Sequence, residues 1–182
     1  MAFDGNIHAV VYTSNIHGRC FSLISTVDVD NGTLVSKGEL EDGEREIYQA
    51  GFDVTKPAYL VGNPAWLYDD STYSKKYDES YYYIKACTPF RGYLLDAKFS
   101  DRFEVSANIT TDTLEKDDYV VLDENGRIKK AGSESNPSNA FVGKVIDVIS
   151  HGFAYPTGSA GTVSTVSKSY LIETIKNEAV AG

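Results

Sequence analysis

The sequence predicts an all-β protein, built as a β-sandwich or as small β-barrel lobes with long loops and little helix. Three observations support this fold class. Short runs rich in Val, Ile and aromatic residues recur along the chain, Asn-Gly turn signals punctuate them, and helical periodicity is convincing only near the end. The 182 residues suit one domain or two small lobes, and we place an N-terminal β-lobe at 1–100 and a C-terminal β-lobe at 101–182.

The first lobe contains several short strand-like runs. A turn signal at Asn31-Gly32 predicts a hairpin, because glycine adopts positive φ without steric cost. Residues 58–69 and residues 140–150 are similar, because each segment has an apolar run that leads to a Val-Gly pair. Either an internal duplication or a strand pattern common to unrelated segments explains this similarity. The predicted strands before 80 lie in the ranges 8–14, 21–29, 33–40 and 58–69.

The middle and end of the chain continue the pattern. Residues 81–95 have β-propensity interrupted by Pro89, and residues 103–110 alternate so that Phe103, Val105, Ala107 and Ile109 share one face. The last apolar segment admits two interpretations, a strand or a helix with a stripe of Leu171, Ile172, Ile175 and Ala179. We favour a strand with a frayed tail, because β-branched residues are frequent there.

The clearest single prediction is a hairpin over residues 117–132. A β-branched run at 119–123 leads into Asn125-Gly126, and a second strand leaves with one apolar residue, Ile128. Residues 140–150 follow as a core strand, and Gly143 inside it predicts a bulge or a close backbone approach.

Composition limits the function classes. The net charge is −9, so long-range electrostatics repel phosphate backbones, and we expect no nucleic-acid or membrane partner. The chain has no apolar run of 18 residues and opens without a secretory signal pattern, which predicts a soluble protein. Cys20 and Cys87 have no metal-binding spacing, so two reduced thiols are expected, with a disulfide as the alternative.

Residues suited to chemistry are dispersed. His8, His17 and His151 lack the spacings of zinc sites, and neither a nucleophile elbow nor a phosphate-binding glycine loop occurs. Residues 28–39 resemble an acidic calcium loop, but Thr33 occupies the place where the sharp turn needs glycine. We therefore predict no catalytic residue, no cofactor and no metal, and a protein that is not an enzyme.

The most unusual segment, residues 66–84, is dense in aromatic residues. Tyrosine offers a large apolar face with a polar tip, which suits a protein interface or a sugar-stacking surface. The ordinary alternative is packing against the protein's own core. The candidate partner interface consists of Trp66, Tyr68, Tyr73, Tyr77, Tyr81, Tyr82 and Tyr83.

The stretch from Asp101 to Gly132, the strand at 140–150 and the final segment at 170–175 together resemble the β-rich pattern of tailed-bacteriophage capsid decoration proteins, also called head-stabilising or cement proteins. The resemblance covers about residues 101–175 and implies a structural virion protein. It would be synthesised in the host cytoplasm and located on the outer capsid surface. Its partners would be the major capsid protein and copies of itself in a homo-oligomer.

Two further functions stay open. The first is a carbohydrate-binding or adhesion module of a phage or bacterial surface that uses the Trp/Tyr-rich segment. The second, less favoured, is a hydrolase that uses the carboxylates Asp69, Asp70, Asp78 or Glu79.

Overall fold

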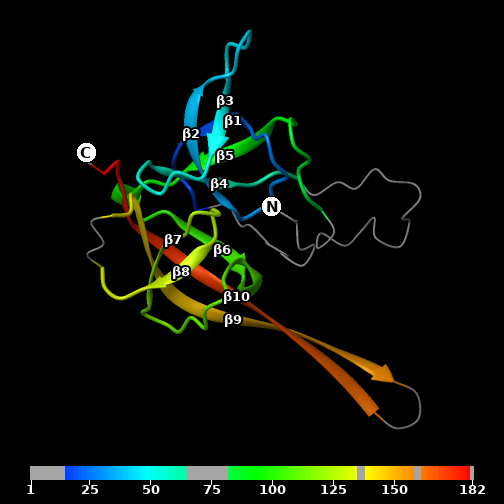
Figure 1. Cartoon of the computed structure of the whole chain (residues 1–182). Helices are drawn as coiled ribbons and strands as arrows, with labels where there is room; N and C mark the ends of the chain where they lie inside the picture. Colours follow the sequence, from blue (N-terminus) through cyan, green and yellow to red (C-terminus); the bar gives the residue numbers. More distant parts are fainter. Residues whose placement is uncertain (1–14, 65–81, 135–137, 158–160, 181–182) are drawn as a thin grey trace.

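The computed structural model confirms an all-β fold made of a small barrel and an open sheet (Figure 1). It describes residues 15–64, 82–134, 138–157 and 161–180, with the backbone alone at 151–157 and 161–167. The only helices in these ranges are two 3₁₀ turns, η3 (Ala97–Phe99) and η4 (Ala107–Ile109). The predicted strand at 8–14 lies outside the described residues.

The barrel closes in the order β1-β3-β2-β4-β5. β1 pairs parallel to β3, and every other pair in the barrel is antiparallel. Its interior is filled by Leu23, Val35, Tyr59, Val61 and Phe90, together with two residues from loops, Val29 and Ile84. The strands are β1 (Cys20–Ile24), β2 (Leu34–Leu40), β3 (Ile47–Gly51), β4 (Ala58–Val61) and β5 (Phe90–Leu94).

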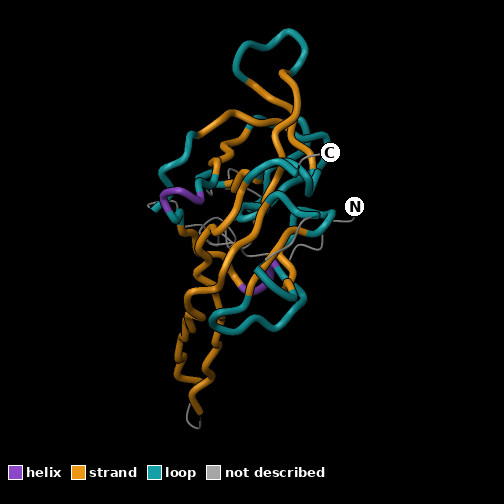
Figure 2. Tube along the Cα trace, turned by 90° about the vertical axis from the view of Figure 1, so that its left-hand side faces the viewer, coloured by secondary structure: helices purple, strands orange, loops and turns teal. Residues whose placement is uncertain are grey.

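The open sheet has the order β6-β10-β9-β7-β8, with all neighbours antiparallel. Two of its strands are 17 residues long and run out of the body as a narrow ribbon (Figures 1 and 2). The strands are β6 (Arg102–Ser106), β7 (Tyr119–Leu122), β8 (Ile128–Ala131), β9 (Phe141–Thr157) and β10 (Gly161–Asn177).

One hydrophobic core joins the barrel to the sheet. Leu34 and Leu60 of the barrel pack in the same buried cluster as Phe103, Phe141 and Ile172 of the sheet. Polar contacts reinforce the junction, since the Asn177 side-chain amide accepts a hydrogen bond from the Ala58 amide (2.7 Å) and donates to the Ala58 and Leu95 carbonyls. The barrel strands thus fall within residues 20–94 and the sheet strands within 102–177, over a shared core.

The hairpin at 117–132 is confirmed as β7 and β8. Gly126 has φ +73°, and the Asp123 side chain accepts hydrogen bonds from the amides of Asn125 and Arg127, both at 2.8 Å. The turn also contacts the barrel, because the Leu34 amide donates to the Gly126 carbonyl at 3.0 Å.

The hairpin predicted at Asn31-Gly32 is wrong. Gly32 does have φ +85°, but the strands on either side, β1 and β2, are not neighbours in the barrel. The loop between them instead crosses to β4, where the Gly32 amide donates to the Val61 carbonyl at 2.8 Å. The Asn31 side chain exchanges two hydrogen bonds of 2.8 Å with the backbone of Asn63. Long-range pairing, which turn chemistry does not encode, decides this connection.

Two predicted strands are shorter than expected. The segment 81–95 forms a strand only from Phe90, after Pro89, and Ile84 makes an isolated bridge with Val29. The segment 103–110 leaves the strand at Ser106 and continues as η4, although Ile109 is still buried.

The final segment is a strand, so the helical alternative for it is wrong. The neighbours that crowd Gly143 are side chains and not backbone, because a Cβ there would lie 2.7 Å from Ile172 Cγ2 and 3.0 Å from Phe141 Cζ. A register shift between Thr174 and Lys176 places a bulge directly opposite this glycine.

Candidate functional site

The feature that the fold leaves without a structural role is the outer part of the β9–β10 ribbon. β9 pairs with β7 only at Val142–Lys144, and β10 pairs with β6 only at Ser169–Glu173. Beyond these flanks, eight cross-strand pairs run from Ser150↔Lys168 to Thr157↔Gly161. We call residues 150–157 and 161–168 the arm. At about 3.4 Å per residue, its strands are roughly 27 Å long.

The arm starts from a firmly packed base. Tyr170 and Ile172 of β10 are buried in the main core, at 4% and 0% exposure. On the other face of β10, Ser169 Oγ donates a hydrogen bond to the buried Glu104 carboxylate, and Arg102 Nη2 lies 2.6 Å from Glu173 Oε2. A second register shift, opposite Leu171 and Ile172, increases the local twist where the ribbon leaves the sheet.

The backbone of the arm presents two edges to its surroundings. Within the described part of the chain, each arm strand pairs with the other arm strand and with no third strand. A lone two-stranded ribbon is only marginally stable in water, and unpaired N–H and C=O groups along a strand are a template for another chain. The geometry is therefore that of a contact element.

The sequence of the arm differs from that of the body. From Val148 to Ile172 the chain has no Asp or Glu, although it contains 26 acidic residues in all. The only residues of the arm that can carry charge are His151 and Lys168. Depletion of charge is typical of the centre of a protein interface, whereas edge strands exposed to solvent usually carry charges or prolines as protection.

The sequence analysis missed the arm. The pattern predicted a core strand at 140–150 and a final strand that includes Leu171 and Ile172, but it did not predict that both strands continue toward each other along the chain. The signal that could have revealed the arm is Thr-Val-Ser-Thr-Val-Ser at 162–167, a β-branched run with no charge.

The predicted aromatic interface lies mostly outside the described residues. Trp66, Tyr68, Tyr73, Tyr77 and Tyr81 lie outside the described residues, as do the carboxylates of the hydrolase alternative. Of the two described members, Tyr82 is half-buried against the barrel core, as the ordinary packing alternative expects, and Tyr83 is 39% exposed.

The buried carboxylate of Asp101 makes hydrogen bonds that hold neighbouring loops together. Asp101 is fully buried and accepts hydrogen bonds from the backbone amides of His17 (2.9 Å) and Asp96 (2.8 Å), and its Oδ1 lies 2.9 Å from His17 Nδ1. His17 itself is exposed and stacks on Phe99. These contacts fix the loop before β1 against η3, so the imidazole has a structural partner.

Asp30 is the most perturbed described carboxyl group. It is 3% exposed, and its Oδ2 has no hydrogen-bond partner among the described residues. Desolvation raises its pKa to about 7, opposed by the positive charge of Arg127 and assisted by the negative charge of Asp28. This is the stretch that resembles a calcium loop, and the nearby arginine disfavours a cation there.

The described residues offer no metal-binding cluster and no membrane-spanning helix. Among the described residues, no group of three or more His, Cys, Asp or Glu side chains is arranged to hold a metal ion. Within the same ranges no helix has the length and apolar character to cross a membrane. Cys20 and Cys87 are both free and exposed.

Comparison with known proteins finds no relative. No family model, no curated protein and no solved structure matches the chain. Any functional conclusion therefore depends on the residues and the geometry described above.

Proposed function

We propose that this chain is a structural virion protein, an auxiliary capsid decoration protein that binds the outer surface of a phage head and stabilises neighbouring major capsid subunits. The observation that carries the proposal is the arm. A compact body with a joint core presents, on a rigid base, a ribbon whose two edges are unpaired within the described chain.

The charge distribution supports the same role. A chain with net charge −9 is repelled by a packaged genome and by any other acidic surface. The arm carries no acidic residue, so it can approach such a surface without like-charge repulsion. On a lattice with many copies, modest contacts of this kind suffice, because linked binding events raise the overall affinity.

The test is co-sedimentation of the purified protein with phage heads that lack it. We expect the full chain to travel with the heads in a density gradient. In a variant with the arm removed, Asn-Gly would join Ile149 to Ser169, which are paired across the ribbon, so that a tight hairpin turn closes the sheet. This variant should fold, because it keeps the core residues Phe141, Val145, Tyr170 and Ile172 of β9 and β10, but it should not sediment with heads.

Two results would contradict the proposal. Failure of the full chain to bind any head preparation would remove the virion function. Equal binding by the full chain and the variant without the arm would show that another surface makes the contact.

The carbohydrate-binding alternative rests on the Trp/Tyr-rich segment, of which the structure describes only Tyr82 and Tyr83. A glycan array with the full chain tests it, and retained glycan binding after removal of the arm would favour this second function.

A further inference from the structure

The loop between β1 and β2, residues 25–33, is tied to three other parts of the molecule. The first is β4 and the chain just after it. The Gly32 amide donates a hydrogen bond to the Val61 carbonyl at 2.8 Å, and the Asn31 side chain holds the backbone of Asn63 by two hydrogen bonds. We call residues 25–33 the β1–β2 loop.

The other two partners of the β1–β2 loop lie before β5 and in the β7–β8 turn. Val29 and Ile84 exchange two backbone hydrogen bonds, of 2.9 and 2.8 Å. Directly after the loop, the Leu34 amide donates to the Gly126 carbonyl at 3.0 Å. One loop therefore connects the chain on both sides of residues 65–81 to the turn of a hairpin in the second sheet.

Asp30 lies between the two loop residues that make the contacts to the barrel, Val29 and Asn31. It is 3% exposed, and its Oδ2 atom has no hydrogen-bond partner among the described residues. A buried carboxylate without a partner loses hydration that nothing replaces, whereas a neutral carboxyl group is buried at much lower cost. The closed loop therefore holds the proton of Asp30 more tightly than an open loop, in which water solvates the carboxylate.

We propose that the β1–β2 loop is a pH-dependent switch, closed while Asp30 is protonated and released from β4, from Ile84 and from the Gly126 turn when Asp30 ionises. Opening transfers the carboxyl group to water and releases one proton to the solvent. Opening is therefore favoured as the pH rises. The inference goes beyond the virion function and does not depend on it.

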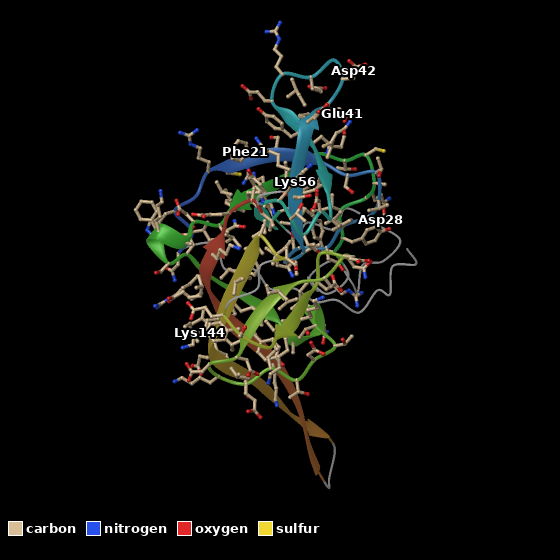
Figure 3. All side chains as sticks on the ribbon, turned by 60° about the vertical axis from the view of Figure 1, so that its left-hand side comes forward. Phe21, Asp28, Glu41, Asp42, Lys56 and Lys144 are labelled. Carbon is tan, nitrogen blue, oxygen red and sulfur yellow. The ribbon has the colours of Figure 1, made fainter. Side chains whose placement is uncertain are left out.

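The electrostatics of the site support a transition at neutral pH. Desolvation raises the pKa of Asp30 from 3.8 to about 7, the positive charge of Arg127 in the β7–β8 turn lowers it, and the negative charge of Asp28 raises it. Asp28, labelled in Figure 3, lies on the loop itself. The other charged residues on the segments that the loop contacts are Lys85, Arg91, Asp123 and Glu124.

The size of the effect follows from these two pKa values. Between 3.8 and about 7, the equilibrium constant for opening rises by up to about tenfold per pH unit, and above this range it levels off. From pH 5 to pH 8 the rise is on the order of 100-fold.

Hydrogen exchange of backbone amides in the full chain measures this opening. Protection factors, which compare each rate with the intrinsic rate at the same pH, should fall on the order of 100-fold between pH 5 and pH 8 in the wild type. In Asp30→Asn they should be independent of pH. The reporting amides are those that make the loop contacts, namely Val29, Gly32, Leu34 and Ile84.

Amides of the second sheet separate local opening from unfolding of the whole protein. Phe103 and Ile172, which are paired between β6 and β10, should be better protected than the loop amides at every pH. Equal protection of the loop and sheet amides would mean that the loop opens only when the protein unfolds, and it would overturn the inference. Parallel pH profiles in the wild type and Asp30→Asn would overturn it as well.

Two charge variants test the switch without a change at Asp30. Arg127→Gln removes the charge that lowers the pKa of Asp30, so the pH at which protection levels off should rise. Asp28→Asn removes the charge that raises it and keeps an oxygen for the Ala86 amide, so this pH should fall. Asp42→Asn, on the exposed β2–β3 loop, is the control and should match the wild type.

The opposite shifts decide the question even if Asp30→Asn does not fold. Identical profiles for Arg127→Gln and Asp28→Asn would overturn the inference. A chain that sediments with heads but shows no pH dependence of loop protection would overturn the switch and leave the proposed function intact.

Discussion

Substitution of Asp30 by asparagine should stabilise the protein at neutral pH and remove the pH dependence that this carboxyl causes. Asp30 lies in the loop before β2, is 3% exposed and has an Oδ2 atom without a hydrogen-bond partner among the described residues. Burial raises its pKa from 3.8 to about 7. The folded state therefore holds the proton at pH values where the unfolded chain has released it.

The sign and size follow from proton linkage. Below pH 3.8 the carboxyl is protonated in both states, so it causes no loss of stability. As the pH rises from there to about 7, the unfolded state gains by ionising while the folded state does not, and stability falls. With these two values, the loss between pH 5 and pH 8 is about 2.5 kcal/mol. An amide at this position cannot ionise, so the variant lacks this loss.

The assay is urea unfolding of the wild type and Asp30→Asn at pH 5, 6, 7 and 8. The difference in unfolding free energy between the two proteins should grow with pH by about 2.5 kcal/mol across this range. Asp42→Asn, an exposed carboxylate at the tip of the β2–β3 loop (Figure 3), is the matched control and should show a constant difference from the wild type.

A direct titration supplies the refutation. The carboxyl carbon of Asp30, followed by NMR, should titrate near pH 7. If it titrates near pH 4, or if Asp30→Asn and the wild type have parallel pH profiles, then this carboxyl is hydrated in the folded state and the desolvation argument is wrong.

Two other substitutions test the body of the fold. Gly126→Val should cost roughly 3 kcal/mol or more in urea unfolding, because φ is +73° and the new Cβ would lie 2.5 Å from the Leu34 carbonyl oxygen. Gly132→Val, where a Cβ meets nothing within 4 Å, is the control, and equal losses for the two would refute the turn geometry. Reversal of the acidic charges in 39–46 to lysine should change stability by at most about 1 kcal/mol per residue, and loss of the fold would contradict the exposed placement of this loop.

Local patterns predicted the elements whose conformation is decided locally. Asn125-Gly126 and the β-branched runs beside it form the expected hairpin, since the turn and both strands lie within 13 residues, from Tyr119 to Ala131. The same reasoning failed at Asn31-Gly32, where the turn forms but the flanking strands join other partners. The same reasoning predicted β9 and β10 to be shorter than they are, because the apolar pattern of a core strand does not show that the strand continues beyond its sheet.

The sequence by itself determined that this protein is all-β, that its turns fall at particular glycines, and that its surface is acidic, because these properties follow from backbone preferences and charge alone. Tertiary structure decided that β1 to β5 close into a barrel, that the Gly126 turn contacts that barrel at Leu34, and that Asp30 is buried. It also decided which lengths of β9 and β10 have neighbours and which form the arm. These outcomes depend on pairings between residues far apart in the chain, whose free energy arises only when the core forms.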